Sequence, residues 1–301
     1  MRFRPLGGSG MVVSAVSMSL VDSAARSRPS DWTSIIYTAL ENGINAFEVV
    51  GRHPAIAEGL GMALKSIERR LVFVSWRVGS AIAPSGTIIR DFSPEGMRNL
   101  TESAIARSDL GYLDAVVLDD PDSTELNPAT LELLKSLREQ GRTRMLGVAG
   151  EDDAIDAYIS AGAFDLLCTP FSLTSGWKER LRLKAAVDRD MGVMGYNYVP
   201  EMFQKGAPAV KTQRATAENP LVGMGTYAFL ETTHNWKSEE LCLAYALTEP
   251  CLASVQIVAD RADRLESLAA ITERDLPPGV GAQIEMARFS PQANADRARR
   301  A

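Results

Sequence analysis

The stretch that decides the fold reads Asn42-Gly43-Ile44-Asn45-Ala46-Phe47-Glu48 at its start and Leu71-Val72-Phe73-Val74-Ser75-Trp76-Arg77-Val78-Gly79 at its end. Each end carries a short apolar run, at residues 44–49 and 71–76. Between them, residues 55–67 repeat apolar positions at helical spacing. A helical pattern between two short apolar runs predicts two parallel strands joined by a crossover helix.

The same alternation continues along the whole chain of 301 residues. Strand-like runs occupy residues 12–18, 44–49, 71–76, 113–118, 145–148, 164–168, 193–196 and 253–258. Helical patterns occupy residues 31–41, 55–67, 94–108, 128–140, 152–161, 178–190, 238–248 and 262–272. Near-continuous apolar strands are typical of a sheet that is covered on both faces. Eight such units predict an α/β fold of the (β/α)₈ TIM barrel type.

Local sequence signals predict where some of the helices begin and end. Asp31 and Ser93 stand where helix N-caps are expected, and Gly141 stands where a helix should end. The longest irregular segment, residues 200–234, follows a strand and is predicted to lie over the barrel mouth. We expect residues 1–288 to form one domain and residues 289–301 to form a flexible tail.

Composition excludes several classes of function. The net charge is −6 with both signs mixed throughout, so nucleic-acid binding has no electrostatic support. No apolar run approaches the roughly 20 residues that cross a bilayer, and the start of the chain lacks the apolar core of a signal peptide. Cys168, Cys242 and Cys251 form neither a disulfide framework nor a zinc motif. These features predict a cytoplasmic protein that does not bind membranes.

The segment from residue 42 to residue 79 resembles the aldo-keto reductases, in which "GINFFDTAxxYG" leads into a strand "VVIATKVG". Residues 111–122 are similar to the family's "DYIDLYQLHxPD", residues 131–148 to "ELxxQGKVRYLGVSN", and residues 241–255 to its last helix and strand. The resemblance implies a barrel of the aldo-keto reductase type. It also implies that residues 3–13 form an N-terminal hairpin that caps the barrel bottom, with the first barrel strand near residues 15–18.

The resemblance places four substituted residues at the catalytic positions. The family's catalytic Asp falls on Glu48, its Tyr on His53, its Lys on Arg77 and its His on Asp119. In the family, the Tyr protonates the carbonyl oxygen while NAD(P)H delivers hydride. The Lys, held by the Asp, lowers the pKa of that Tyr, and the His orients the carbonyl.

Each substitution has two interpretations. His53 could act as a general acid, because an imidazole is the side chain best suited to proton transfer near neutral pH, or it is a polar loop residue. Glu48 and Arg77 keep the charges of the family's pair as a structural ion pair, or Arg77 captures a carboxylate or phosphate. Asp119 would repel a carbonyl oxygen unless it is protonated or paired with Arg77 or a cationic group. We expect no metal, because Arg77 opposes a cation beside Glu48, His53, Asp119 and Asp120.

Most cofactor positions of the family have also changed. Its first-strand "GLGT" becomes Ser17-Met18-Ser19-Leu20, its "SN" becomes Ala149-Gly150, and Cys168 replaces the Gln that holds the carboxamide. The resemblance implies four cofactor-binding candidates. Tyr196 would stack on nicotinamide and has Asn197 beside it, and Arg261 and Glu266 lie in the family's final signature. Asp260 and Asp263 favour NADH over NADPH. The remaining alternative is that the protein binds neither dinucleotide.

Three functions therefore remain as hypotheses. The first is a divergent homologue that has lost NADPH-dependent carbonyl reduction and binds a small-molecule ligand or a protein partner. The second is an active NAD(P)H-dependent oxidoreductase with a rebuilt site, in which His53 is the acid beside the Glu48–Arg77 pair. The third is redox-neutral acid–base chemistry by His53, Glu48 and Asp119 on a substrate anchored by Arg77.

Overall fold

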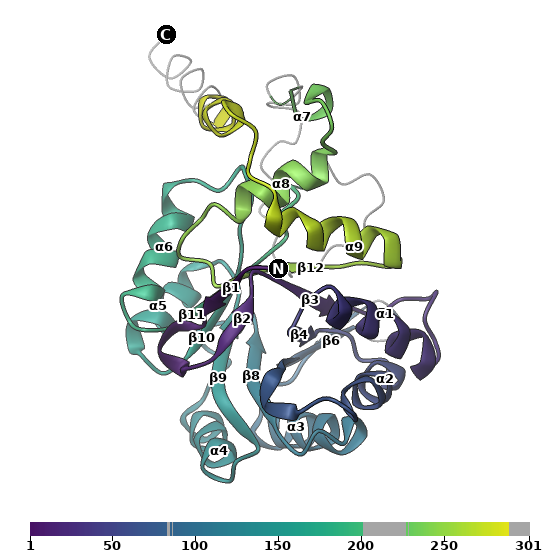
Figure 1. Ribbon diagram of the computed structural model, residues 1–301. Coiled ribbons are helices and arrows are strands. Elements are labelled where there is room, and N and C mark those ends of the chain that lie inside the picture. Colours follow the sequence, from purple (N-terminus) through teal and green to yellow (C-terminus); the bar gives the residue numbers. More distant parts are fainter. Residues whose placement is uncertain (83–84, 86, 201–226, 228, 289–301) are drawn as a thin grey trace.

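The computed structural model describes residues 1–82, 85, 87–200, 227 and 229–288. Its centre is a closed barrel of eight parallel strands in the order β10-β11-β12-β3-β4-β5-β8-β9 (Figure 1). The barrel strands are β3 (Val16–Leu20), β4 (Ala46–Val49), β5 (Phe73–Val78), β8 (Leu113–Asp119), β9 (Thr143–Ala149), β10 (Leu166–Pro170), β11 (Gly192–Tyr196) and β12 (Ser254–Ile257). This arrangement confirms the predicted (β/α)₈ barrel.

Helices ring the strands and cover their outer face (Figure 1). They are α1 (Pro29–Glu41), α2 (Pro54–Leu64), α3 (Pro94–Ser108), α4 (Pro128–Glu139), α5 (Asp153–Ala161), α6 (Trp177–Val187), α8 (Ser238–Ala246) and α9 (Ala262–Ala270). A further helical segment covers residues 280–288. The apolar side chains between helices and strands form one large core, and a second core fills the barrel interior. Burial of both strand faces explains the near-continuous apolar runs in the sequence.

The N-terminal hairpin predicted across the barrel bottom is present. Strands β1 (Phe3–Pro5) and β2 (Val12–Ser14) pair antiparallel and lie across one end of the barrel. Asn45, just before β4, fastens the hairpin. Its Oδ1 accepts a hydrogen bond from the Ser14 amide at 2.7 Å, and its Nδ2 donates to the carbonyls of Val12 and Leu71 at 3.1 and 3.3 Å. The first barrel strand begins one residue later than expected, at Val16.

Two of the three predicted helix boundaries are confirmed. The Ser93 hydroxyl accepts a hydrogen bond from the Gly96 amide and caps α3, and Gly141 follows α4 in a left-handed conformation (φ 71°). The expectation for Asp31 was wrong. Pro29 is favoured at a first helical position, so α1 starts there, and Asp31 lies in the first turn and accepts hydrogen bonds from Arg28.

Close helix packing accounts for the Leu60-Gly61 pair in α2. A Cβ atom added at Gly61 would lie 2.1 Å from the Ser108 carbonyl oxygen, so a larger residue would force α2 and α3 apart. Glycine at this position therefore lets the two helices pack closely.

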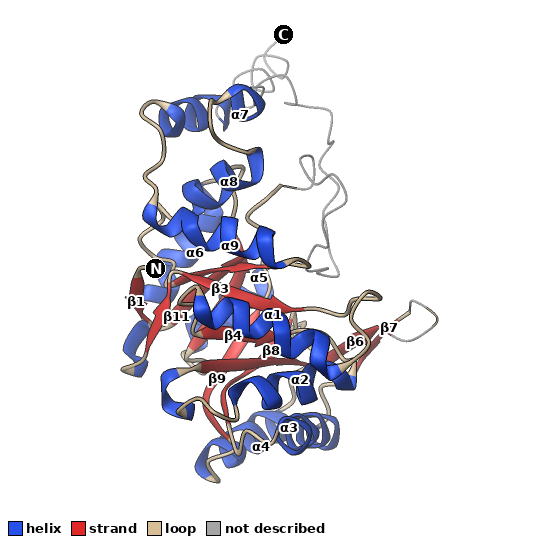
Figure 2. Cartoon of the chain, turned by 45° about the vertical axis from the view of Figure 1, so that its right-hand side comes forward, coloured by secondary structure: helices blue, strands red, loops and turns tan. Residues whose placement is uncertain are grey.

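Some elements were not predicted. A small hairpin of β6 (Ser80–Ile82) and β7 (Ile88–Arg90) follows β5 and projects beyond the barrel strands (Figure 2). The segment predicted to be irregular, residues 200–234, contains a short helix α7 (Phe229–Thr232). Residues 201–226 of that segment, and the expected tail at residues 289–301, lie outside the described residues.

Candidate active site

The inward-facing positions near the carboxyl end of the barrel are polar. Strand register places Ser19 beside Glu48, and Glu48 beside Ser75. Side chains alternate along a strand, so every second residue of these strands points into the barrel. The buried polar side chains at inward-facing positions are Ser17, Ser19, Glu48, Ser75, Arg77, Ser254 and Gln256. TIM-barrel enzymes place their chemistry at this end, so the polar interior marks the candidate site.

Arg77 is the centre of the site. Its side chain is 2% exposed, and its Nη2 donates to Oε2 of the fully buried Glu48 at 2.8 Å. Its Nη1 lies 3.4 Å from Oδ1 of Asp119, whose other oxygen accepts a hydrogen bond from the Ser80 hydroxyl. Burial alone lowers the pKa of Arg77, but the charges of Glu48 and Asp119 outweigh burial and raise this pKa above its ordinary value. Arg77 is therefore a fixed cation that cannot exchange a proton near neutral pH.

Glu48 also begins a chain of buried hydrogen bonds across the barrel. The Cys168 thiol donates to Oε1 of Glu48 at 3.4 Å, and Nε2 of Gln256 lies 3.9 Å from the Cys168 sulfur. The Ser19 hydroxyl donates to Oε1 of Gln256 at 3.2 Å. Burial and the charge of Glu48 raise the pKa of Cys168 well above its ordinary value. The thiol therefore stays protonated and is not a nucleophile.

Tyr196, at the end of β11, is fully buried and lies against Arg77. The guanidinium carbon of Arg77 lies 4.9 Å from the centroid of the Tyr196 ring. Among the described residues, the Tyr196 hydroxyl has no hydrogen-bond partner, and neither has Nε of Arg77. Burial raises the pKa of Tyr196 well above its ordinary value, and the charge of Arg77 offsets this only in part. One face of the ring predicted to stack on nicotinamide is thus covered by the protein itself.

His53 lies on the loop before α2 and is exposed. Its Nδ1 accepts a hydrogen bond from the Ala55 amide at 3.2 Å, so the ring caps the first turn of α2. Asp22, in the loop after β3, accepts hydrogen bonds from the amides of Arg52 and His53 at 2.8–3.0 Å. The structure therefore unites Glu48, Arg77, Asp119 and Tyr196 in one contact network. It places His53 in a capping position outside that network.

The segments expected to hold a dinucleotide meet at the ends of β3 and β12. A cavity of about 50 Å³ lies there, which is room for a few water molecules. Arg26 spans it: Nη1 donates to the Ala259 carbonyl at 3.2 Å, and Nη2 donates to the Asp260 carbonyl. Loop 21–28 is thereby fastened to the segment that follows β12.

Most of the remaining cofactor-binding candidates either form ion pairs within the protein or lie on its exposed surface. Arg261 pairs with Asp263 at 2.7 Å, and Arg264 pairs with Glu239 at 2.6 Å. Glu266 is exposed on α9. Asn197 follows β11 with a left-handed backbone (φ 51°), a conformation that Asn tolerates better than most residues. These side chains do not form a phosphate site with one another.

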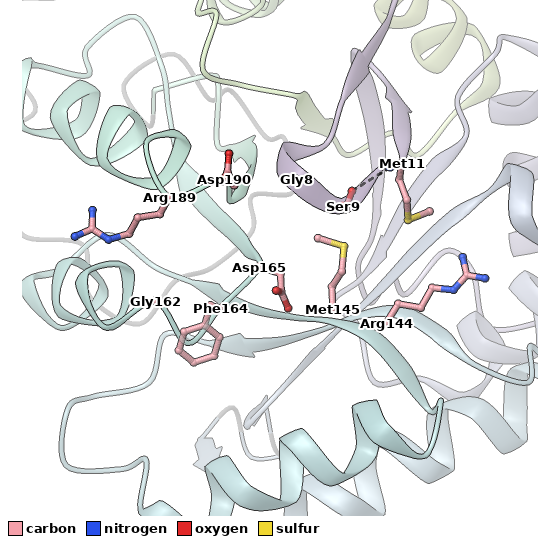
Figure 3. Close-up of a pocket in the computed structure, with 10 residues that line it drawn as sticks. All are labelled: Gly8, Ser9, Met11, Arg144, Met145, Gly162, Phe164, Asp165, Arg189 and Asp190. Carbon is pink, nitrogen blue, oxygen red and sulfur yellow. Dashed lines mark hydrogen bonds between the residues drawn. The ribbon is translucent and has the colours of Figure 1, made fainter.

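A larger cavity, of about 560 Å³, lies at the opposite end of the barrel beside the N-terminal hairpin (Figure 3). The guanidiniums of Arg144 and Arg189 lie on opposite sides of it and point apart (Figure 3). Arg144 contacts Asp114 at 3.3 Å, and Asp165 contacts Arg138 at 3.0 Å. The bottom of such barrels serves stability, so this cavity is not the candidate active site.

Within the part of the chain that the structure describes, no group of three or more His, Cys, Asp or Glu side chains is arranged to hold a metal ion. Among the helices described there, none has the length and apolar character needed to span a membrane.

Sequence reasoning missed several residues at this end of the barrel, notably Arg52, Ser80 and Gln256. A signal for Gln256 was present, because it is a polar residue at an alternate position of an otherwise apolar strand. Arg52 directly precedes a position that the resemblance had already marked. Ser80 reaches Asp119 only because the β6–β7 hairpin folds back at the strand end, and nothing local in the sequence indicates this.

Comparisons with known proteins agree with the barrel fold. The sequence profile of the Aldo/keto reductase family matches residues 17–288. A curated soybean (Glycine max) protein, "Probable aldo-keto reductase 1", is 28% identical over 121 residues, which is 40% of this chain and 35% of that protein. The solved structure of aldo-keto reductase AKR11C1 from Bacillus halodurans, in its holo form, superposes with a TM-score of 0.78 at 17% identity and covers 95% of this chain and 96% of the other. That structural likeness concerns the fold alone. Because the profile spans nearly the whole barrel, including all four substituted positions, the chain belongs to the aldo/keto reductase family.

Proposed function

We propose that this family member does not reduce carbonyl compounds by the family's mechanism, and that its barrel mouth binds a small molecule instead. The main support is the state of Arg77, which is buried between Glu48 and Asp119 and covers one face of Tyr196. Arg77 stands where the resemblance places a lysine whose charge assists a neighbouring phenol. Here that phenol is replaced by the capping ring of His53.

The arrangement also lacks a tuned proton donor. A general acid must sit within hydrogen-bond reach of the substrate with a pKa near the working pH. Arg77 holds its proton, and the raised pKa of Tyr196 makes its phenol a poor acid. Asp119 would present a negative charge to a carbonyl oxygen, which disfavours the developing oxyanion.

The described residues do not fit a nicotinamide dinucleotide. Stacking on Tyr196 would require the ring to leave its fully buried position against Arg77. The cavity between β3 and β12 is far smaller than a nucleotide, and Arg26 bridges it. Arg261 and Arg264, the basic residues of the final signature, already have carboxylate partners.

An assay of NADPH and NADH oxidation with a panel of aldehydes and quinones tests this proposal. We expect no turnover above the rate without enzyme. Aldehyde-dependent turnover that His53→Ala abolishes would overturn the proposal and establish the oxidoreductase with a rebuilt site. Glu58→Gln, a change on the exposed face of α2, serves as the control variant for such turnover.

A further inference from the structure

The guanidinium of Arg26, in the loop between β3 and α1, is held by backbone carbonyls and by an aromatic ring. Its Nη1 donates to the Ala259 carbonyl at 3.2 Å, and its Nη2 donates to the Asp260 carbonyl. Its carbon atom lies 5.4 Å from the centroid of the Trp32 ring. The side chain is half-buried, so these contacts replace part of the water that would otherwise surround the cation.

The loop that carries Arg26 has other anchors. The carbonyl of Arg26 accepts a hydrogen bond from Nε1 of Trp32 at 3.1 Å. Asp22, near the start of the loop, accepts hydrogen bonds from the amides of Arg52 and His53 at 2.8–3.0 Å. None of these bonds uses the Arg26 side chain. We therefore expect the loop to keep its place when that side chain is shortened.

The small cavity between β3 and β12 lies beside the Arg26 side chain. It has a volume of about 50 Å³, and its lining includes Arg26, Trp32, Val258 and Ala259. Truncation of Arg26 to alanine would join the space of its guanidinium to this cavity. The enlarged space would keep the two carbonyl oxygens and the aromatic ring that now contact the guanidinium.

These contacts favour a planar cation. Carbonyl oxygens accept hydrogen bonds but donate none, so they cannot bind an anion, and an aromatic face attracts positive charge. An ammonium ion supplies the charge as a compact point. A guanidinium presents several N–H groups in one plane, so it can donate to two carbonyls at once while it lies over a ring.

Nearby carboxylates make a secondary contribution. Burial lowers the pKa of Arg26, and the charges of Asp260 and Asp31 offset this only in part. Each of these carboxylates also contacts another arginine: Asp260 lies 3.5 Å from Arg264, and Asp31 lies 2.9 Å from Arg28. The carbonyl oxygens and the ring are therefore the main partners of the Arg26 guanidinium.

We propose that the ends of β3 and β12 form a binding site for a guanidinium group, and that Arg26 is its internal ligand. A small alkylguanidinium compound takes the same place when the Arg26 side chain leaves it, and this exchange frees loop 21–28 from the segment after β12. In the unmodified chain, the tethered guanidinium competes with such a compound. This inference goes beyond the proposed function and does not depend on it, because the site uses neither Arg77 nor Asp119.

Chemical complementation of a truncated side chain tests the inference. Arg26→Ala is titrated with ethylguanidinium, which carries the atoms that the substitution removes. Calorimetry measures affinity, and the indole N–H resonance of Trp32 reports where the compound binds. We expect a millimolar dissociation constant, a shift of the Trp32 resonance, and binding at least about fivefold tighter than to the unmodified chain. n-Propylammonium, which has the charge without the fork, should bind Arg26→Ala at least about fivefold more weakly.

Arg28→Ala is the matched control, because it is the same substitution in the same loop at a side chain that is 76% exposed. It should bind ethylguanidinium no more tightly than the unmodified chain does. If Arg26→Ala does not fold, Arg26→Met keeps an unbranched stem without the fork and is titrated with the guanidinium ion instead.

Three results would overturn the inference. They are the absence of saturable binding by the Arg26 variant up to about 20 mM, equal binding of n-propylammonium, and equal binding of ethylguanidinium by Arg28→Ala. Each would leave the proposed loss of carbonyl reduction untouched, whereas nicotinamide-dependent turnover would overturn that proposal whatever these titrations show.

Discussion

The guanidinium carbon of Arg77 lies 4.9 Å from the centroid of the Tyr196 ring, and both side chains are buried inside the barrel. A cation that covers an aromatic face in this way is held by the ring and by its carboxylate partners together. This contact joins a position that the resemblance assigns to proton transfer to a position that it assigns to the cofactor. The change at one position therefore bears directly on the other.

Breaking the buried pair should be costly. Glu48→Gln leaves Arg77 with only Asp119, at 3.4 Å, and we expect the free energy of unfolding to fall by about 3–5 kcal/mol. Glu125→Gln, which breaks the half-buried pair with Arg90, should cost about 1 kcal/mol or less. Urea denaturation of both variants measures the difference. Equal losses would show that the buried Glu48–Arg77 pair contributes no more to the free energy of unfolding than the half-buried Arg90–Glu125 pair.

Removing the Tyr196 hydroxyl should be nearly neutral in the absence of ligand. This hydroxyl has no partner among the described residues, so Tyr196→Phe should change the free energy of unfolding by less than about 1 kcal/mol and in the stabilising direction. Tyr198 is the matched control, because its hydroxyl donates to Glu239 at 2.8 Å. Tyr198→Phe should destabilise by about 1 kcal/mol or more. A larger loss in Tyr196→Phe than in Tyr198→Phe would contradict the account of the site.

The N-terminal hairpin depends on Asn45. Asn45→Ala removes three side-chain hydrogen bonds, to Ser14, Val12 and Leu71, and should cost about 2–3 kcal/mol. Asn42→Ala removes one bond within its own helix turn, to the Thr38 carbonyl, and should cost about 1 kcal/mol or less. Hydrogen exchange at the amides of β1 and β2 should increase in the first variant only. Unchanged exchange there would mean that other contacts hold the hairpin.

Stability should fall in alkali through Tyr245. Burial and a hydrogen bond to Glu285 raise the pKa of Tyr245 to about 12, whereas an unfolded tyrosine titrates near about 10. The folded state therefore keeps a proton that the unfolded state releases, so this contribution is fully present below about pH 10 and is lost as pH rises toward 12. Tyr245→Phe should show a shallower loss of stability between about pH 10 and 12 in urea titrations. Parallel pH profiles for the two proteins would refute this assignment.

Much of the fold was predictable because its strands and helices follow from local patterns of apolar residues. The apolar runs and the helical spacing gave each barrel strand and its crossover helix, since both are set by neighbouring residues in the chain. Asp31 shows the limit of a local signal: it could be a cap or a first-turn acid, and Pro29 decides between the two.

The site was less predictable because its contacts join residues far apart in sequence. That Glu48 and Arg77 would meet was foreseeable from their positions on neighbouring strands. The contact of Cys168 with Glu48 crosses the barrel, and the bond of Arg26 to Ala259 joins opposite ends of the chain. Neither residue type nor spacing encodes such distances, so the sequence could not show that Tyr196 is covered.

The most direct test of the central claim is calorimetric titration of the protein with NADPH and with NADH in separate experiments. If Arg77 and Arg26 close the family's cofactor site, neither dinucleotide should give a saturable binding isotherm at concentrations up to about 1 mM. Saturable binding of either one with a micromolar dissociation constant would contradict the account. It would show that the Tyr196 ring can be uncovered and would place this chain among the nicotinamide-binding members of its family.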